Sequence, residues 1–104
     1  MLRIIKVAGD SLSPVYNDGD FVLIAKIPVC IRNLRAGDIV VFNHPEYGQL
    51  IKKIVSVSDR GNEIFVIGFH ENSVDSRIFG AINKKDILGK VIWHIKKPGY
   101  ENRP

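Results

Sequence analysis

The alternation of short apolar runs with turn-forming residues is the feature that most constrains how this chain folds. Runs rich in Val, Ile and Phe are separated by clusters of Gly, Asp, Asn and Pro, a pattern typical of a small, mostly β domain. Helix is scarce, with short turns expected near residues 11–16 and 83–87. The predicted fold class is therefore mostly β, with antiparallel sheets and little helix. We expect strands at about residues 2–7, 20–26, 38–43, 49–57, 63–68 and 88–95.

Turn sequences indicate how these strands connect. The turn at Asp59–Asn62 lies between the fourth and fifth predicted strands and favours a hairpin. Two other turns repeat one pattern, in which Gly19-Asp20 and Gly37-Asp38 each precede an apolar strand. Glycine supplies the unusual backbone angle there, and the aspartate side chain can bond amides of the following turn. We interpret both Gly-Asp turns as structural.

The length of 104 residues predicts one domain over residues 1–104, with a single core. The longest apolar runs, Phe21–Ala25 and Ile39–Phe42, are far shorter than the roughly 18 residues that a membrane span needs. The first residues interleave charged with apolar side chains, unlike a secretory signal. Cys30 is the single cysteine and cannot form an internal disulfide, which agrees with a reducing compartment. We expect a cytoplasmic protein without a membrane span.

The charge balance raises the question of a nucleic-acid partner. Fifteen Lys and Arg against eleven Asp and Glu give a net charge of +4, which favours anionic partners in general. The basic residues are spread along the chain, however, and cluster no more densely than Lys-Lys pairs, so we expect a solvated surface and no nucleic acid. The three histidines, His44, His70 and His94, are too dispersed for a metal site. We expect neither a metal nor another cofactor.

The segment Gly9–Pro14 places Ser11 in a tight turn directly after a predicted strand. A hydroxyl there projects from the sheet, and turn amides, such as those of Asp10 and Ser11, can point at a developing oxyanion, as acyl transfer requires. A serine between glycine and proline is, taken alone, more often simple turn chemistry. Ser11 is therefore a candidate nucleophile, and it needs a general base elsewhere in the chain.

Two adjacent lysines are the candidates for that base, since none of the histidines shows the partners of a Ser-His-Asp triad. A lysine base must be neutral near pH 7, so it has to be desolvated. Lys52 and Lys53 both lie inside an apolar run. Strand alternation does not choose between them, because Lys52 shares its face with Ile54 and Lys53 shares its face with Val55. The alternative is an edge strand whose lysines are only solvated or snorkelling.

The segment Asn72–Arg77 is dense in hydroxyl, carboxylate and guanidinium groups. An ion pair between Asp75 and Arg77 would brace a loop, and the Ser73 hydroxyl would hold a neutral lysine amine in place. The alternative is a polar turn with a surface ion pair, which contributes little to stability. The segment therefore supplies candidate supporting groups for the lysine.

Taken in order, these segments resemble the signal-peptidase-type Ser/Lys peptidases. The resemblance implies a coiled antiparallel β domain like that of signal peptidases and repressor peptidases. It also implies that Ser11 is the nucleophile, Lys52 the base, Ser73 the residue that orients it, and Asp75 with Arg77 the brace. The segments that carry the resemblance are Gly9-Asp-Ser-Leu-Ser-Pro14, Gly19-Asp20, Gly37-Asp-Ile-Val-Val41, Ile51-Lys-Lys-Ile54 and Asn72-Ser-Val-Asp-Ser-Arg-Ile-Phe-Gly80.

The chain departs from that family pattern in three places. Leu12 replaces the usual methionine, a nearly volume-conserving change. The family's Gly-Asp-Asn element reads Gly68-Phe-His70, and the stretch from Gly68 to Ser76 is one residue shorter than usual. The membrane anchor that precedes the serine in ordinary signal peptidases is not expected, because Ser11 lies almost at the first residue.

The closing segment Gly89–Pro98 and the short length look most like the nickel-type superoxide dismutase maturation proteases. This resemblance implies a serine endopeptidase that removes an N-terminal propeptide from a precursor bound as an extended peptide. The alternative is a non-catalytic peptidase-like module that binds peptides or nucleic acid. The self-cleaving repressor peptidases, which share the Gly-Asp-Ser-x-x-Pro motif, are the last of the three hypotheses.

Overall fold

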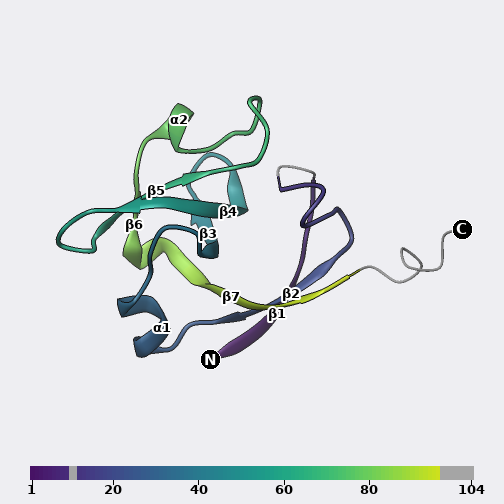
Figure 1. The fold of residues 1–104 in the computed structure, drawn as a ribbon, viewed down its shortest axis with the longest axis horizontal. Helices are drawn as coiled ribbons and strands as arrows, with labels where there is room; N and C mark the ends of the chain where they lie inside the picture. Colours follow the sequence, from purple (N-terminus) through teal and green to yellow (C-terminus); the bar gives the residue numbers. More distant parts are fainter. Residues whose placement is uncertain (10–11, 97–104) are drawn as a thin grey trace, which may run out of the picture.

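A computed structural model describes residues 1–9 and 12–96 of the chain. Its strands form one antiparallel sheet in the order β1-β2-β7-β3-β4-β5-β6 (Figure 1). The expected mostly β fold with little helix is therefore confirmed. The elements are β1 (Leu2–Lys6), β2 (Phe21–Ala25), α1 (Pro28–Arg32), β3 (Ile39–His44), β4 (Gly48–Val57), β5 (Glu63–Ile67), α2 (Ser76–Phe79), β6 (Ile82–Asn83), the 3-10 turn η1 (Lys84–Asp86) and β7 (Ile87–Ile95).

All six predicted strands are present, with ends shifted by one residue at most. The hairpin expected across Asp59–Asn62 is also present, since β4 and β5 pair there antiparallel. The sequence missed β6, α1 and α2, because two to five residues are too few to show a period. The 3-10 turn η1 lies inside the turn expected at 83–87. Of the turn expected at 11–16, the described part folds back through the amides of Val15 and Tyr16, which donate to the Leu12 carbonyl.

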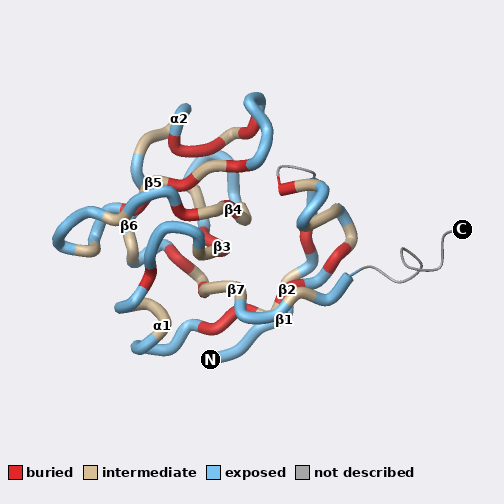
Figure 2. Tube along the Cα trace, viewed as in Figure 1, coloured by how far each residue is buried: buried red, intermediate tan, exposed pale blue. Residues whose placement is uncertain are grey.

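Strand β7 joins the two halves of the molecule, because it pairs with β2 along one part and with β3 along another. One buried cluster lies under β3, β4 and β5 around Phe42 and Ile54, and a second lies under β1 and β2 around Val22 and Ile24 (Figure 2). Gly89 marks a close crossing of β7 and β2, since a Cβ atom there would lie 3.0 Å from the Ile24 Cβ. Strand β7 therefore contributes to both clusters, with Ile87 in the first and with Leu88 and Val91 packed against the second.

Among the strand edges that have no neighbouring strand in the described chain, two lie near the cavities described below. Strand β1 is the first strand of the sheet and pairs on one side only, with β2. Strand β4 pairs with β5 only from Lys53 onward, so the edge of residues 48–52 on that side has no strand partner in the same described ranges. Both edges border the cavities described below.

Candidate active site

Lys52 lies in the interior of the molecule, on the wall of the larger of two neighbouring cavities. The side chain leaves β4 on the same face as the buried Ile54, and Lys52 as a whole is only 3% exposed. The cavity holds about 500 Å³. Its lining residues are Ala8, Leu50, Lys52, His70, Asn72, Ser73 and Val74. Lys52 thus lines the cavity while almost all of its surface is buried.

The surroundings of Lys52 favour the neutral amine. Burial lowers the pKa of Lys52 below its ordinary value, because a charged ammonium loses hydration there. The negative charge of Asp75 opposes this shift, and the positive charge of Arg77 adds to it. Burial outweighs the attraction of Asp75, so the pKa of Lys52 is lowered overall. A lysine in this state can accept a proton nearer neutral pH than a solvated lysine can.

Lys53 differs from Lys52 in its burial and in its surroundings. It is only partly buried, and its ammonium lies 5.7 Å from the ring centroid of Phe69 in a cation–π contact. The sequence left the choice between these two lysines open, and the structure places Lys52 alone of the two on the cavity wall.

Ser73 faces the same cavity as Lys52. It is 7% exposed, and its Oγ has no hydrogen-bond partner within residues 1–9 and 12–96. A hydroxyl that makes no hydrogen bond to the protein but lines a cavity is available to bond water or a bound group there. The unpartnered Ser73 Oγ and the Lys52 amine therefore line one cavity, although no hydrogen bond joins them in this structure.

Asp75 anchors the loop that carries Ser73. It is completely buried, and its carboxylate accepts from the Gly68 amide at 2.8 Å and from the Arg77 amide at 3.0 Å. The Arg77 guanidinium adds two donors, Nε at 3.0 Å and Nη2 at 2.7 Å. Burial by itself would raise the pKa of Asp75, but the bonds from Arg77 and Gly68 outweigh it and lower that pKa. Asp75 is thus an ionised, fully bonded carboxylate.

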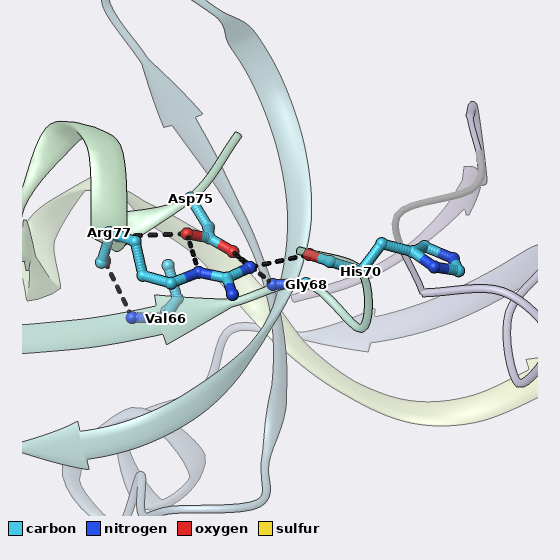
Figure 3. A network of polar contacts seen from close by, with 6 residues as sticks. Val66, Gly68, His70, Asp75 and Arg77 are labelled. Carbon is cyan, nitrogen blue, oxygen red and sulfur yellow. Dashed lines mark hydrogen bonds and ion pairs between the residues drawn. The ribbon is translucent and has the colours of Figure 1, made fainter. Parts of the chain in front are cut away.

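Further contacts tie the same loop to strand β5 (Figure 3). The Arg77 guanidinium also donates to the His70 carbonyl at 2.8 Å, while the His70 ring points away from the Asp75–Arg77 pair. The Ser76 Oγ accepts from the Val66 amide at 2.9 Å. Residues 68–77 are consequently fixed at both ends, although this loop is one residue shorter than the family pattern leads one to expect.

A smaller hollow of about 80 Å³ adjoins the first cavity. The two share Ala8 and Leu50 in their walls. The smaller one lies between the edges of β1 and β4 and is lined by Ile5, Lys6, Ala8, Val41, Gln49, Leu50 and Ile51. The unpaired edges of the two strands therefore face a continuous depression that leads to Lys52.

The predicted nucleophile Ser11 and the neighbouring Asp10 lie outside the described residues. Their described neighbours connect to the site: Ala8 lines both cavities, and the Gly9 amide donates to Asp18 Oδ1 at 2.9 Å. Leu12, which occupies the family's methionine position, is 1% exposed. The chain thus reaches the wall of the Lys52 cavity two residues before Asp10.

Sequence reasoning missed several residues at or near the site. His70 and Asn72 line the Lys52 cavity, but a loop residue gives no local signal that it will face a hollow. The buried Asp20 and the partly buried His94 form a pair outside the cavity, and their sequence separation of 74 residues hides it. No group of His, Cys, Asp and Glu within the described ranges has the arrangement of a metal site. None of the helices in those ranges is long and apolar enough to cross a membrane.

A lysine whose pKa is lowered by burial and which lines a cavity is the kind of group that can act as a general base in a peptidase. Comparison with known proteins agrees, because the chain belongs to the Peptidase S24-like family, which matches residues 1–92. Signal peptidase I V of Bacillus subtilis (strain 168) is a distant relative, 26% identical over 99 residues that cover 81% of this chain. The chain spans about 59% of the length of that relative. The domain is therefore of the serine peptidase class, in a family related to signal peptidase I.

Proposed function

We propose that this chain is a serine endopeptidase with a Ser11/Lys52 dyad that removes an N-terminal propeptide from a precursor protein. The observation that carries the proposal is the burial of Lys52 on a cavity wall, beside the unpartnered hydroxyl of Ser73. Membership of the Peptidase S24-like family supports the same reaction class.

The proposed chemistry needs only groups of this chain and a water molecule. Neutral Lys52 accepts the Ser11 hydroxyl proton while the serine oxygen attacks the scissile carbonyl, and turn amides near Ser11 stabilise the oxyanion. The Lys52 ammonium then gives its proton to the departing amine, which leaves an ester on Ser11. A water molecule, deprotonated by Lys52, attacks that ester, and the proton returns to Ser11 as the acid product leaves. Ser73 orients the amine throughout, and Asp75 with Arg77 holds the Ser73 loop.

The substrate segment binds as an extended strand in this proposal. The unpaired edges of β1 and of residues 48–52 both border the depression, and each offers backbone donors and acceptors to an added strand. The small hollow between them has mostly aliphatic walls, formed by residues such as Ile5, Val41 and Leu50. Backbone pairing fixes the register of the peptide, and the hollow accepts one compact apolar side chain.

For the precursor we propose a nickel-type superoxide dismutase. The support for this finer step is the resemblance of the closing segment Gly89–Pro98 to the maturation proteases of those enzymes. In those systems the protease exposes the amino terminus with which the mature dismutase binds nickel. The protease itself needs no metal for this reaction, and the histidines of this chain have no metal role in the proposal.

The test is incubation of the purified chain with a propeptide-bearing precursor of a nickel-type dismutase, followed by intact mass. We expect cleavage before the mature amino terminus by the wild type and by Lys53→Ala. Ser11→Ala and Lys52→Ala should not cleave. Lys53→Ala is the matched control, because it removes the same type of side chain from the adjacent residue of the same strand.

Two further results would change the proposal in different ways. If the precursor stays intact while a small activated ester acylates Ser11, the dyad stands and the substrate assignment is wrong. If Ser11→Ala binds peptide as the wild type does, and the wild type is neither acylated nor active, the chain is a non-catalytic binding module.

A further inference from the structure

A second buried carboxylate lies outside the cavity that holds Lys52. Asp20 is completely buried just before β2, and the His94 Nε2 on β7 lies 2.7 Å from its Oδ2, within hydrogen-bond distance. The Tyr16 ring stacks against the His94 ring, with 4.4 Å between the centroids. Burying a carboxylate is costly unless it is paired or hydrogen-bonded, and the partly buried His94 is one of the groups that pair with Asp20.

The pair fastens the segment between β1 and β2, residues 7–20. Inside that segment the Asn17 amide donates to Asp20 Oδ2 at 3.0 Å, and Ser13 Oγ donates to Asn17 Oδ1 at 2.9 Å. At its base, Val7 and Gly19 are joined by a backbone bond of 2.9 Å. These contacts tie the segment to itself, whereas His94 belongs to a strand at the other end of the sequence. His94 therefore fixes where the segment sits on the sheet.

An internal comparison shows that the turn does not need the histidine. Asp38 ends a turn with the same bonds as Asp20: each carboxylate accepts from the amide three residues earlier, at 3.1 Å from Arg35 and at 3.0 Å from Asn17. Each aspartate carbonyl accepts from an adjacent strand, from Ile54 at 2.8 Å and from Val7 at 2.7 Å. The two turns are therefore copies of one backbone arrangement.

The copies differ in their β7 partner. The Asp38 side chain is 14% exposed, and its partner Lys90 lies at a looser 3.5 Å. The Asp20 side chain is fully buried, and its partner His94 lies at 2.7 Å. The Gly37-Asp38 turn thus keeps this backbone arrangement with only a partly exposed lysine as the β7 partner of its aspartate. The tighter, buried version occurs at the end of the segment that contains Ser11, the proposed nucleophile.

We propose that His94 is a positioning residue for Ser11, acting through Asp20 and Tyr16 to hold residues 7–20 against the sheet. This inference rests on the proposed dyad. Proton transfer between a serine and a lysine needs a heavy-atom separation of about 2.6–3.2 Å, and a displacement near 1 Å costs about 10²-fold in rate. His94 does not take part in the chemistry; it keeps the serine-bearing segment in register with the Lys52 wall.

The experiment measures acylation of Ser11 by p-nitrophenyl acetate, with the modified residue located by peptide mass mapping. The rate is recorded against ester concentration, so that the maximal rate and the half-saturating concentration separate. We expect His94→Ala to lower the maximal rate about 10- to 100-fold with little change in half-saturation. Lys90→Ala, the matched control on the same strand, should leave both values unchanged.

Conservative variants keep the test decisive if His94→Ala folds poorly. His94→Gln places an amide N–H where Nε2 lies and should recover most of the rate. His94→Asn places its amide one bond shorter and should not. A purely structural role predicts instead that Gln and Asn behave alike and that losses follow the melting temperature.

Hydrogen exchange gives a readout that does not depend on activity. In His94→Ala the amides of Asn17 and Gly19 should exchange faster, while those of Arg35 and Gly37 in the second turn should not change. A reactive wild type with unchanged His94→Ala acylation and exchange overturns the positioning role alone. An unreactive wild type in which Ser11→Ala and Lys52→Ala make no difference overturns the proposed dyad and this inference with it.

Discussion

Two completely buried aspartates, Asp75 and Asp20, hold different segments of this molecule in different ways. Asp75 takes its cationic partner from two residues away, since Arg77 belongs to the same loop. Asp20 takes its partner from β7, 74 residues away in sequence. The lysine side of the cavity is thus held by a local contact, and the segment containing Ser11 is held by a long-range one.

This difference between a local and a long-range contact affects how easily each segment is displaced. Asp75 receives four hydrogen bonds, and its partner Arg77 keeps its charge at all ordinary pH values. The contact between Asp75 and Arg77 forms as soon as the loop of residues 68–77 forms, because both partners lie in it. The contact between Asp20 and His94 requires β2 and β7 to be docked first. We therefore expect the lysine side to be the more robust part of the fold, and the 7–20 segment to be the more easily displaced.

The largest expected effect is on the lysine side itself. Lys52→Ala removes the proposed base, and general-base catalysis is worth about 10²- to 10⁴-fold, so acylation of Ser11 should fall by that factor. Lys53→Ala should change the rate less than about twofold, because it removes only a partly exposed charge that contacts Phe69. Parallel ester-acylation rates of the two variants provide the measurement. A loss confined to Lys53→Ala would transfer the base role to Lys53.

The next largest effect is a loss of stability, which should be greater for Asp75→Ala than for Asp38→Ala. Asp75→Ala leaves the buried amides of Gly68 and Arg77 without their acceptor, which should cost about 2–4 kcal/mol of unfolding free energy. Asp38→Ala removes a partly exposed acceptor and should cost only about 1 kcal/mol. Urea unfolding of both variants and of Asp20→Ala checks this order. Equal losses for Asp75→Ala and Asp38→Ala would show that burial of the carboxylate is not decisive.

The pH dependence of stability follows from the same carboxylate. The folded pKa of Asp75 is lowered, so its contribution is present above its unfolded pKa of about 4 and is lost as pH falls through the folded value. Wild-type unfolding free energy should therefore drop below about pH 4, and the drop should be smaller in Asp75→Asn. Urea midpoints between about pH 3 and 7 measure it. An identical acid loss in both proteins would assign the effect to other carboxylates.

A smaller effect is expected for Ser73→Ala, in which the acylation rate and the stability should respond differently. Its hydroxyl has no partner in residues 1–9 and 12–96, so Ser73→Ala removes a buried group that gains nothing in the free protein. Stability should stay the same or rise slightly. The acylation rate should still fall about tenfold if the hydroxyl orients the Lys52 amine. Ser76→Ala is the contrasting variant, because Ser76 Oγ accepts a hydrogen bond from the Val66 amide. The Ser76→Ala protein should therefore be less stable than the wild type. An unchanged rate in Ser73→Ala would contradict the orienting role.

Apolar alternation and turn residues were enough to predict the strands, and the order of short motifs was enough to bring Ser11, Lys52 and Asp75 together as candidates. The choice between Lys52 and Lys53 could not be predicted, because β4 carries apolar residues on both faces and has a register shift after Ile54. The contact between Asp20 and His94 could not be predicted either, since a long-range contact produces no periodic pattern in the sequence. The Gly-Asp aspartates were expected to bond the following turn, whereas both carboxylates reach back to the amide three residues earlier.

The smallest effect is a displacement of the pH–rate profile, and it tests whether the two sides of the molecule act independently on Lys52. Because the base must be neutral, acylation should rise with pH and level off below the ordinary lysine pKa of 10.5, since burial lowers the pKa of Lys52. Arg77 lowers this pKa through its charge and Asp75 raises it. Arg77→Gln should therefore move the profile to higher pH, and Asp75→Asn should move it to lower pH. His94→Gln contributes no change of charge near Lys52 and should leave the profile in place, altering only its height. A profile that moves with His94→Gln would mean that the 7–20 segment controls the protonation of Lys52, and the division between a local brace and a long-range positioning contact would fail.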